Sequence, residues 1–253
     1  MKDTIVVIPA HLNSKRLPKK ILLNIMGLPM IEHVRRRLML SIEKKNIFVA
    51  TCDKSISNIV EHYGGNVIFT SKKHTNGTSR VSEAINKIKC NKVILAQGDE
   101  PLMLPNLFKK FYDEVNDDKE SFVWNATAPI NTKDYSKRSF VKCQINYKNN
   151  IVKLFRTTNK SILAEKNLRI RKILGLIAFK KEVLIKYKKL KKTSLEDSLS
   201  IEQIRYLENN INIKSVFLSK SSDSINEPKD VKVVINNLKK NKIQKIILNK
   251  ILV

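Results

Sequence analysis

The sequence lacks the features that would indicate a membrane-spanning, metal-bound or disulfide-bonded protein. No apolar run reaches the roughly 18 residues that a transmembrane helix requires, and no secretory signal pattern precedes the first apolar run. The three cysteines show no pairing or metal-ligand spacing, and the four histidines form no metal motif. We therefore expect a cytoplasmic protein with reduced thiols.

Acidic residues are also scarce, since 23 Asp and Glu stand against 49 Lys and Arg, a formal net charge of +26. Such a charge suggests a polyanionic partner. However, the lysines are spread over the whole chain, which indicates a compositional bias, and only 6% of residues are aromatic, with no platform for stacking bases. We expect no nucleic-acid partner. With 253 residues, 42% of them hydrophobic, the chain is long enough for one large domain, with or without an insert.

The sequence has no Gly-rich Walker loop, but it has a basic loop in the corresponding place. Residues 4–8 are apolar at every position, which is typical of a strand buried on both faces of a parallel sheet. The next twelve residues contain Lys15, Arg16, Lys19 and Lys20. Open α/β sheets bind anions at such strand ends. A solvated basic loop is the alternative.

Strands and helices alternate through the first hundred residues. The pattern predicts strands at 46–50, 66–70 and 92–96, and helices starting at Pro29, at Asp53 or Ser55 (candidate caps), and at Ser79 or Arg80. This order indicates a doubly wound, mostly parallel α/β sheet. Further along we expect a strand at 122–126, a hairpin of 140–147 with 151–155, a strand at 173–179, and one helix from a Thr193–Glu196 capping box to about Glu208.

The fourth of these strands runs into Gln97-Gly98-Asp99-Glu100-Pro101. A carboxylate there could hold Mg²⁺, which usually takes one or two protein carboxylates together with substrate oxygens and water. The alternative is a helix cap with Pro101 in the first turn. Together with the basic loop, the motif favours nucleotidyl transfer.

Several segments resemble a known family in order and spacing. They are Ile8-Pro9-Ala10 with Ser14, Arg16-Leu17-Pro18 and Lys20; Gly27 with Pro29-Met30-Ile31 and His33-Val34; Val49-Ala50-Thr51 with Asp53; and residues 97–101. Weaker matches are Lys142, Arg156, Leu174-Gly175 and residues 201–208. Over residues 1–239 the chain resembles the 3-deoxy-manno-octulosonate cytidylyltransferases, or CMP-Kdo synthetases.

The resemblance implies a Rossmann-like nucleotide-diphospho-sugar transferase fold and transfer of CMP from CTP to the anomeric hydroxyl of Kdo, a step of lipopolysaccharide biosynthesis. Arg16 and Lys20 would clamp phosphates, and Ser14 and the amides near Ala10 would bind phosphate oxygens. Asp99 would hold Mg²⁺, together with Asn226. The family segment near the cytidine is matched by Gly77, Thr78 and Arg80.

The resemblance also divides the single domain of residues 1–239 into a nucleotide-binding half, 1–120, and a sugar-binding part, 121–215, whose antiparallel insert would form a homodimer contact. The sugar would meet Gln97, Arg156, Glu202 and Gln203.

The chain departs from the family pattern at six positions: His11 for Arg, Asn76 for Ser, Ser79 for Glu, Phe155 for Ser, Ile173 for His and Asn226 for Asp. These departures leave three alternatives open. The chain could act on another ulosonic acid, such as an amino-Kdo or a sialic-acid-like sugar. It could be a weakened enzyme, or a non-catalytic basic binding protein on the same fold.

Residues 240–253 form an extra basic amphipathic tail beyond the region of resemblance. Peripheral contact with an anionic membrane is one reading. Docking onto its own domain or a dimer partner is the interpretation that we favour.

Overall fold

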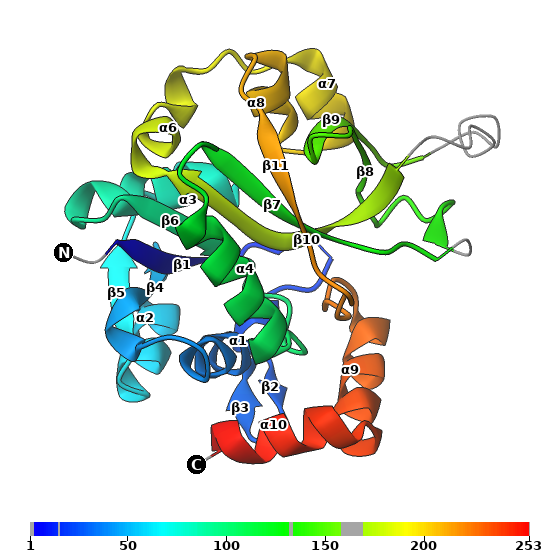
Figure 1. The fold of residues 1–253 in the computed structure, drawn as a ribbon. Coiled ribbons are helices and arrows are strands. Elements are labelled where there is room, and N and C mark those ends of the chain that lie inside the picture. The colour runs from blue at the N-terminus through cyan, green and yellow to red at the C-terminus, as the bar shows by residue number, and fades with distance from the viewer. Residues whose placement is uncertain (1–2, 15, 132–133, 158–168, 253) are drawn as a thin grey trace.

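A nine-stranded mixed sheet runs through the protein in the order β5-β4-β1-β6-β10-β7-β11-β9-β8 (Figure 1). The computed structural model describes residues 3–14, 16–131, 134–157 and 169–252. Parallel pairs join β1 to β4 and β6, β4 to β5, and β7 to β11, whereas β10 runs antiparallel to β6 and β7. The strands are β1 (Thr4–Ala10), β4 (Ile47–Thr51), β5 (Asn66–Phe69), β6 (Lys92–Ala96), β7 (Val123–Ala128), β8 (Lys142–Ile145), β9 (Asn150–Phe155), β10 (Arg169–Lys180) and β11 (Ile213–Phe217). A separate small hairpin pairs β2 (Asn24–Ile25) with β3 (Leu28–Pro29).

Strand β1 lies inside the sheet and separates two hydrophobic cores. Ile5 and Val7 point into one core, whereas Val6 and Ile8 point into the other, and all four side chains are fully buried. This alternation explains why the sequence is apolar at every position of the strand. The predicted buried parallel strand is confirmed.

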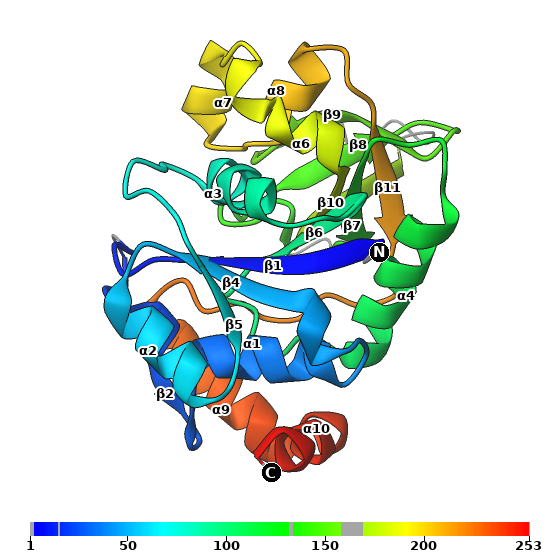
Figure 2. The same ribbon diagram turned by 90° about the vertical axis from the view of Figure 1, so that its left-hand side faces the viewer.

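Helices cover both faces of the sheet (Figure 2). One face carries α1 (Met30–Met39), α2 (Lys54–His62), α4 (Pro105–Asp117), α9 (Pro228–Lys240) and α10 (Lys242–Leu252). The other carries α3 (Gly77–Ala84), α6 (Lys181–Ile185), α7 (Ser194–Leu199) and α8 (Ile204–Glu208). The predicted fold class, a mostly parallel doubly wound sheet with an antiparallel part, is therefore confirmed.

The prediction of one helix from Thr193 to Glu208 is wrong. Thr193 does accept the expected capping hydrogen bond from the Glu196 amide, at 3.3 Å. The helix then ends because Ser200 adopts a left-handed conformation (φ 51°), and α8 starts only at Ile204. Arg156 stabilises the break, since its guanidinium donates to the carbonyls of Leu199 and Ser200.

Smaller differences concern boundaries and one cap. Strand β10 starts at Arg169, earlier than the expected residue 173, and α3 starts at Gly77 with Asn76 as its N-cap. Asp53 occupies the N-cap position of α2, one of the two positions that the sequence offered, but its side chain makes no capping hydrogen bond to that helix. The carboxylate instead accepts from the Leu12 amide at 2.9 Å and shapes the basic loop.

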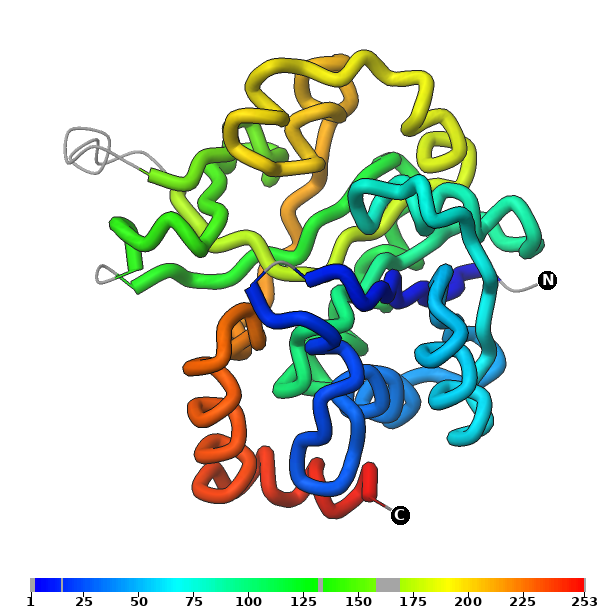
Figure 3. Tube along the Cα trace, turned by 180° about the vertical axis from the view of Figure 1, so that it is seen from behind, coloured from blue at the N-terminus to red at the C-terminus, as the bar shows by residue number. Residues whose placement is uncertain are grey.

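Helix α10 docks onto its own domain, which is the arrangement that the sequence favoured. Ile247, Leu248 and Ile251 are buried, and Gln244 Nε2 donates to the Leu102 carbonyl at 2.8 Å. Arg36 donates to the carbonyl of Ile251, close to the helix end. Figure 3 shows α10 beside the β2–β3 hairpin. Residue 253 of the expected tail lies outside the described residues, and no helix of the described part of the chain could cross a bilayer.

Candidate active site at the strand ends

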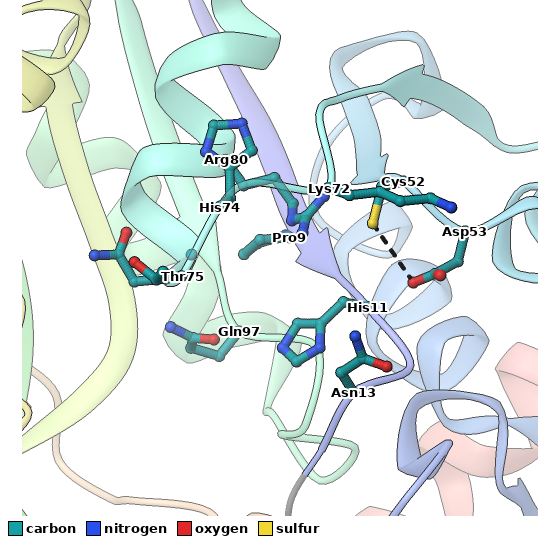
Figure 4. Close-up of a pocket in the computed structure, with 12 residues that line it drawn as sticks. Pro9, His11, Asn13, Cys52, Asp53, Lys72, His74, Thr75, Arg80 and Gln97 are labelled. Carbon is teal, nitrogen blue, oxygen red and sulfur yellow. Dashed lines mark hydrogen bonds between the residues drawn. The ribbon is translucent and has the colours of Figure 1, made fainter.

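The carboxyl ends of β1, β4 and β6 meet at one edge of the sheet, where two adjoining cavities open. The larger has a volume of about 440 Å³ and the smaller about 320 Å³. Both are lined by Pro9, His11, Asn13 and Gln97, so they form one continuous site. Figure 4 shows the side chains of the larger cavity. Parallel strands that end together explain why these distant segments converge.

The smaller cavity brings together most residues that the sequence assigned to phosphate and metal binding. They are Ala10, Ser14, Arg16, Lys20, Asp99 and Asn226. Lys20 Nζ lies 2.6 Å from Asp99 Oδ2 and also donates to the Ile225 carbonyl at 2.9 Å. Arg16 Nη2 donates to Asn226 Oδ1 at 3.1 Å. Two cations therefore face two oxygen donors. Lys15 of the predicted basic loop lies outside the described residues.

Asn226 reaches this cavity although more than one hundred residues separate it from the other members. The Ile225 amide donates to the Asp99 carbonyl at 2.9 Å, which fixes the segment before α9 against the end of β6. Asp230 then accepts from the amides of Asn226 and Glu227, at 2.8 Å each. This capping arrangement orients the Asn226 side chain toward Arg16.

The larger cavity is framed by α3 and by the loop before it. Gly77 and Arg80 line it, as the cytidine-side prediction expected, together with Lys72, His74 and Asn76. The backbone at Gly77 approaches β1 closely, because a Cβ built there would lie 3.2 Å from Pro9 Cγ. Two departures from the family pattern form the helix cap, since Asn76 Oδ1 accepts from the Ser79 amide at 2.8 Å. Thr78 is buried under this cap.

His11 projects between the two cavities (Figure 4). Burial lowers its pKa, and the nearby charges of Arg80 and Lys20 lower it further, against the opposing effect of Asp53 and Asp99. An arginine at this position would carry a fixed charge. His11 instead supplies a titratable group whose lowered pKa favours the neutral form near pH 7.

The residues assigned to the sugar are placed less uniformly. Gln97 lines both cavities, but Arg156, Glu202 and Gln203 line neither. Glu202 Oε2 accepts from the Thr78 amide at 3.0 Å, and burial raises the pKa of this carboxyl. Gln203 Nε2 donates to Asn125 Oδ1 at 2.9 Å. These two side chains connect α8 to α3 and to β7.

Sequence reasoning assigned no site role to three polar residues that support the site. Glu100 Oε1 accepts from the Gly175 amide at 3.0 Å, and burial, followed by the Asp99 charge, raises the Glu100 pKa to about 7. Lys142, which had only been noted as a weak match, is fully buried and donates to the carbonyls of Lys137 and Arg156, at 2.6 Å each. Asn125 could have been noticed as an amide within the buried strand β7.

The family model described as "Cytidylyltransferase" matches residues 5–215. The chain belongs to the cytidylyltransferase family. It is similar to the 3-deoxy-manno-octulosonate cytidylyltransferase of Escherichia coli, with 30% identity over 90% of this chain and 93% of that protein. It is also similar to the one of Fusobacterium nucleatum subsp. nucleatum, with 32% identity over 94% of this chain and 98% of that protein.

A solved structure gives the same assignment. The chain matches a CMP:2-keto-3-deoxy-manno-octonic acid synthetase complexed with CTP, with a TM-score of 0.86, 28% identity, and coverage of 94% of this chain and 99% of that one. A cytidylyltransferase from Leptospira borgpetersenii, at 13% identity and a TM-score of 0.67, shares the fold. The predicted family and fold are confirmed.

Proposed function

We propose that this cytidylyltransferase transfers CMP from CTP to the anomeric hydroxyl of 3-deoxy-manno-octulosonate and releases pyrophosphate. The observation that carries the proposal is the cluster of Arg16, Lys20, Asp99 and Asn226 at the strand ends. The names of the relatives and the CTP-bound structural neighbour support the choice of nucleotide and sugar. By resemblance, the product would serve lipopolysaccharide biosynthesis.

The chemistry requires charge neutralisation more than a covalent intermediate. CTP would lie with its triphosphate in the smaller cavity and its cytidine toward α3, in the larger one. Negative charge grows on the leaving pyrophosphate, where Arg16 and Lys20 can donate charge-assisted hydrogen bonds. Lys20 would then exchange Asp99 for phosphate oxygens. His11, which lies near the charges of Lys20 and Arg80, would accept a proton as the phosphates bind.

Asp99 and Asn226 would hold Mg²⁺. The carboxylate of Asp99 and the amide oxygen of Asn226 are oxygen donors that suit this ion, and the Ile225–Asp99 hydrogen bond keeps the two segments together. The described residues contain no group of three or more metal-ligating side chains, but Mg²⁺ at a phosphate takes most of its ligands from substrate and water. When bound, the ion would neutralise phosphate charge.

The sugar would approach from the side of Gln97, with Arg156 near its carboxylate. Arg156 and Lys142 lie together, and their hydrogen-bond acceptors are backbone carbonyls. The pair therefore provides positive charge for an acidic sugar. We also propose a homodimer formed through the β8–β9 hairpin, whose Tyr147 and Val152 are exposed. Light scattering would test the dimer.

The decisive experiment measures pyrophosphate release with CTP, Mg²⁺ and Kdo. We expect turnover with CTP and little with ATP, and thermal stabilisation by CTP in preference to ATP. Release that requires an amino-Kdo or a sialic-acid-like sugar would replace the proposed substrate. Lack of release with every ulosonic acid tested, at any Mg²⁺ concentration, would overturn the proposal and favour a non-catalytic binding protein.

A further inference from the structure

Residues 71–76 form a thin wall between two cavities. On one side lies the 440 Å³ cavity of the candidate site, and on the other lies a separate cavity of about 290 Å³. His74, Thr75 and Asn76 line both cavities. The wall belongs to no helix or strand, so it has no regular backbone ladder to hold it. Side-chain hydrogen bonds must therefore determine its position.

One carboxylate holds two points of this wall. Glu83, on α3, accepts from the Ser71 amide through Oε1 at 2.9 Å and from His74 Nε2 through Oε2 at 2.6 Å. The other ring nitrogen of His74 lies 3.1 Å from Ser79 Oγ. The His74 side chain is only 3% exposed, so both ring nitrogens are used inside the protein.

The end of the wall nearest α3 is fixed in another way. Asn76 caps the helix and donates through Nδ2 to the Tyr187 hydroxyl at 3.1 Å. Without Glu83, the wall would keep this attachment at Asn76, the contact of His74 with Ser79 and a long contact from Arg80 to the Ser71 carbonyl (3.5 Å). It would lose both hydrogen bonds to the Glu83 carboxylate. The part that faces the larger cavity, from Lys72 to Thr75, would then be held less firmly.

We infer that Glu83 and His74 form a positioning clasp, which holds residues 71–76 in the arrangement that accepts the cytosine end of CTP. The inference rests on the proposed function, since it assumes that the cytidine occupies the larger cavity. Neither residue needs to touch the nucleotide. The clasp acts by ordering the wall before CTP arrives, so that binding does not bear the entropic cost of ordering it.

The test compares CTP binding by Glu83→Ala, Glu83→Gln and the wild-type protein, by calorimetry without sugar. We expect Glu83→Ala to bind CTP about tenfold more weakly, because two hydrogen bonds to a charged group are lost. Glu83→Gln keeps an oxygen for Ser71 and an amide that can hydrogen-bond to His74, so it should recover most of the affinity. In turnover assays, the KM for CTP should rise while kcat at saturating CTP and the KM for the sugar stay within about twofold.

The matched control is Asp113→Asn, which removes a surface ion pair with Lys109 on α4, away from the site. It should leave CTP binding unchanged. If Glu83→Ala does not fold, His74→Leu carries the same comparison. CTP affinity equal to that of the wild type in a folded variant would overturn the clasp. The clasp would also be overturned if Glu83→Gln lost as much CTP affinity as Glu83→Ala and if kcat fell by the same factor as the affinity in both variants. Because binding is measured without sugar, failure of sugar turnover would count against the proposed function and not against the clasp.

Discussion

The part of the molecule that we propose for the nucleotide (the nucleotide side) and the part that we propose for the sugar (the sugar side) are held together by different kinds of contact. On the nucleotide side, side chains of opposite charge contact each other directly, as in the Lys20–Asp99 pair at 2.6 Å. On the sugar side, Arg156 donates to the backbone carbonyls of Arg138, Leu199 and Ser200. The nucleotide side is a charge cluster at the strand ends, whereas the sugar side is a framework of side chains that tie separate loops together.

This difference distinguishes side chains that would bind substrate from side chains that hold the backbone in place. Lys20 and Asp99 are partly exposed to the cavity, so in the proposed complex they would exchange each other for phosphate and metal. Arg156 cannot exchange its partners as freely, because they fix the break between α7 and α8. A mutation on the nucleotide side should therefore affect the chemical step, whereas one on the sugar side should affect the shape of the sugar pocket.

The largest effect should come from Asp99→Asn. The amide keeps the shape of the side chain but removes the charge that would hold Mg²⁺ and pair with Lys20. Loss of a preorganised electrostatic group commonly costs about a hundred- to a thousandfold in kcat, and we expect at least the upper value here. Pyrophosphate release at saturating CTP and sugar measures the loss, and circular dichroism checks the fold.

Asp223→Asn is the matched control for that experiment, because Asp223 accepts from Asn237 on the surface, in the segment that precedes Asn226. It should retain nearly full activity. An Asp99→Asn variant with wild-type turnover would remove both the proposed metal role and the contrast between the two sides.

A smaller and more selective effect should follow from Arg156→Lys. One ammonium group cannot reach acceptors in the three directions that the guanidinium serves. The break at Ser200 should loosen, and the KM for the sugar should rise about tenfold. The KM for CTP should stay within about twofold. Initial rates with each substrate varied separately measure the two constants.

Arg171→Lys serves as the control, since Arg171 lies on β10 with hydroxyl partners, Thr127 and Ser215, at 3.4 and 3.3 Å. Both constants should stay near wild type. If Arg156→Lys raised the two KM values equally, the two sides would act as a single unit and the contrast would fail.

The same contrast explains what the sequence could predict. The nucleotide side depends on short motifs that directly follow strands, so recognising the strands places Arg16, Lys20 and Asp99 at one edge. The sugar side depends on tertiary contacts between distant segments. Glu202 and Thr78, which are in contact, lie 124 residues apart in the sequence, and no local sequence pattern predicts the contact. Ser200 likewise does not predict the left-handed conformation that ends α7, because glycine is the usual residue at such a position.

The smallest effect concerns Glu100, which joins the two sides through the Gly175 amide. Gly175 must be glycine, because a Cβ there would lie 2.5 Å from Glu100 Oε1. Burial, followed by the Asp99 charge, raises the Glu100 pKa from 4.5 to about 7, so between these values the folded protein binds a proton that the unfolded chain has released. The stability that this proton provides is complete below about pH 4.5 and is lost as the pH rises through 7.

Glu100→Gln removes this titration while keeping an oxygen for Gly175. Measured with chelator, its melting temperature relative to the wild type should therefore increase by ~5 °C between pH 4.5 and pH 7.5. Glu114→Gln, which removes a surface pair with Lys110 at 3.6 Å, should show a constant difference over that range. If the melting-temperature difference between Glu100→Gln and the wild type were also constant over this pH range, the Glu100 carboxyl would already be ionised in the folded protein. The hydrogen bond from the Gly175 amide to Glu100 would then be charge-assisted. In that case the charged residues of the nucleotide side would include Glu100 and reach the sugar side.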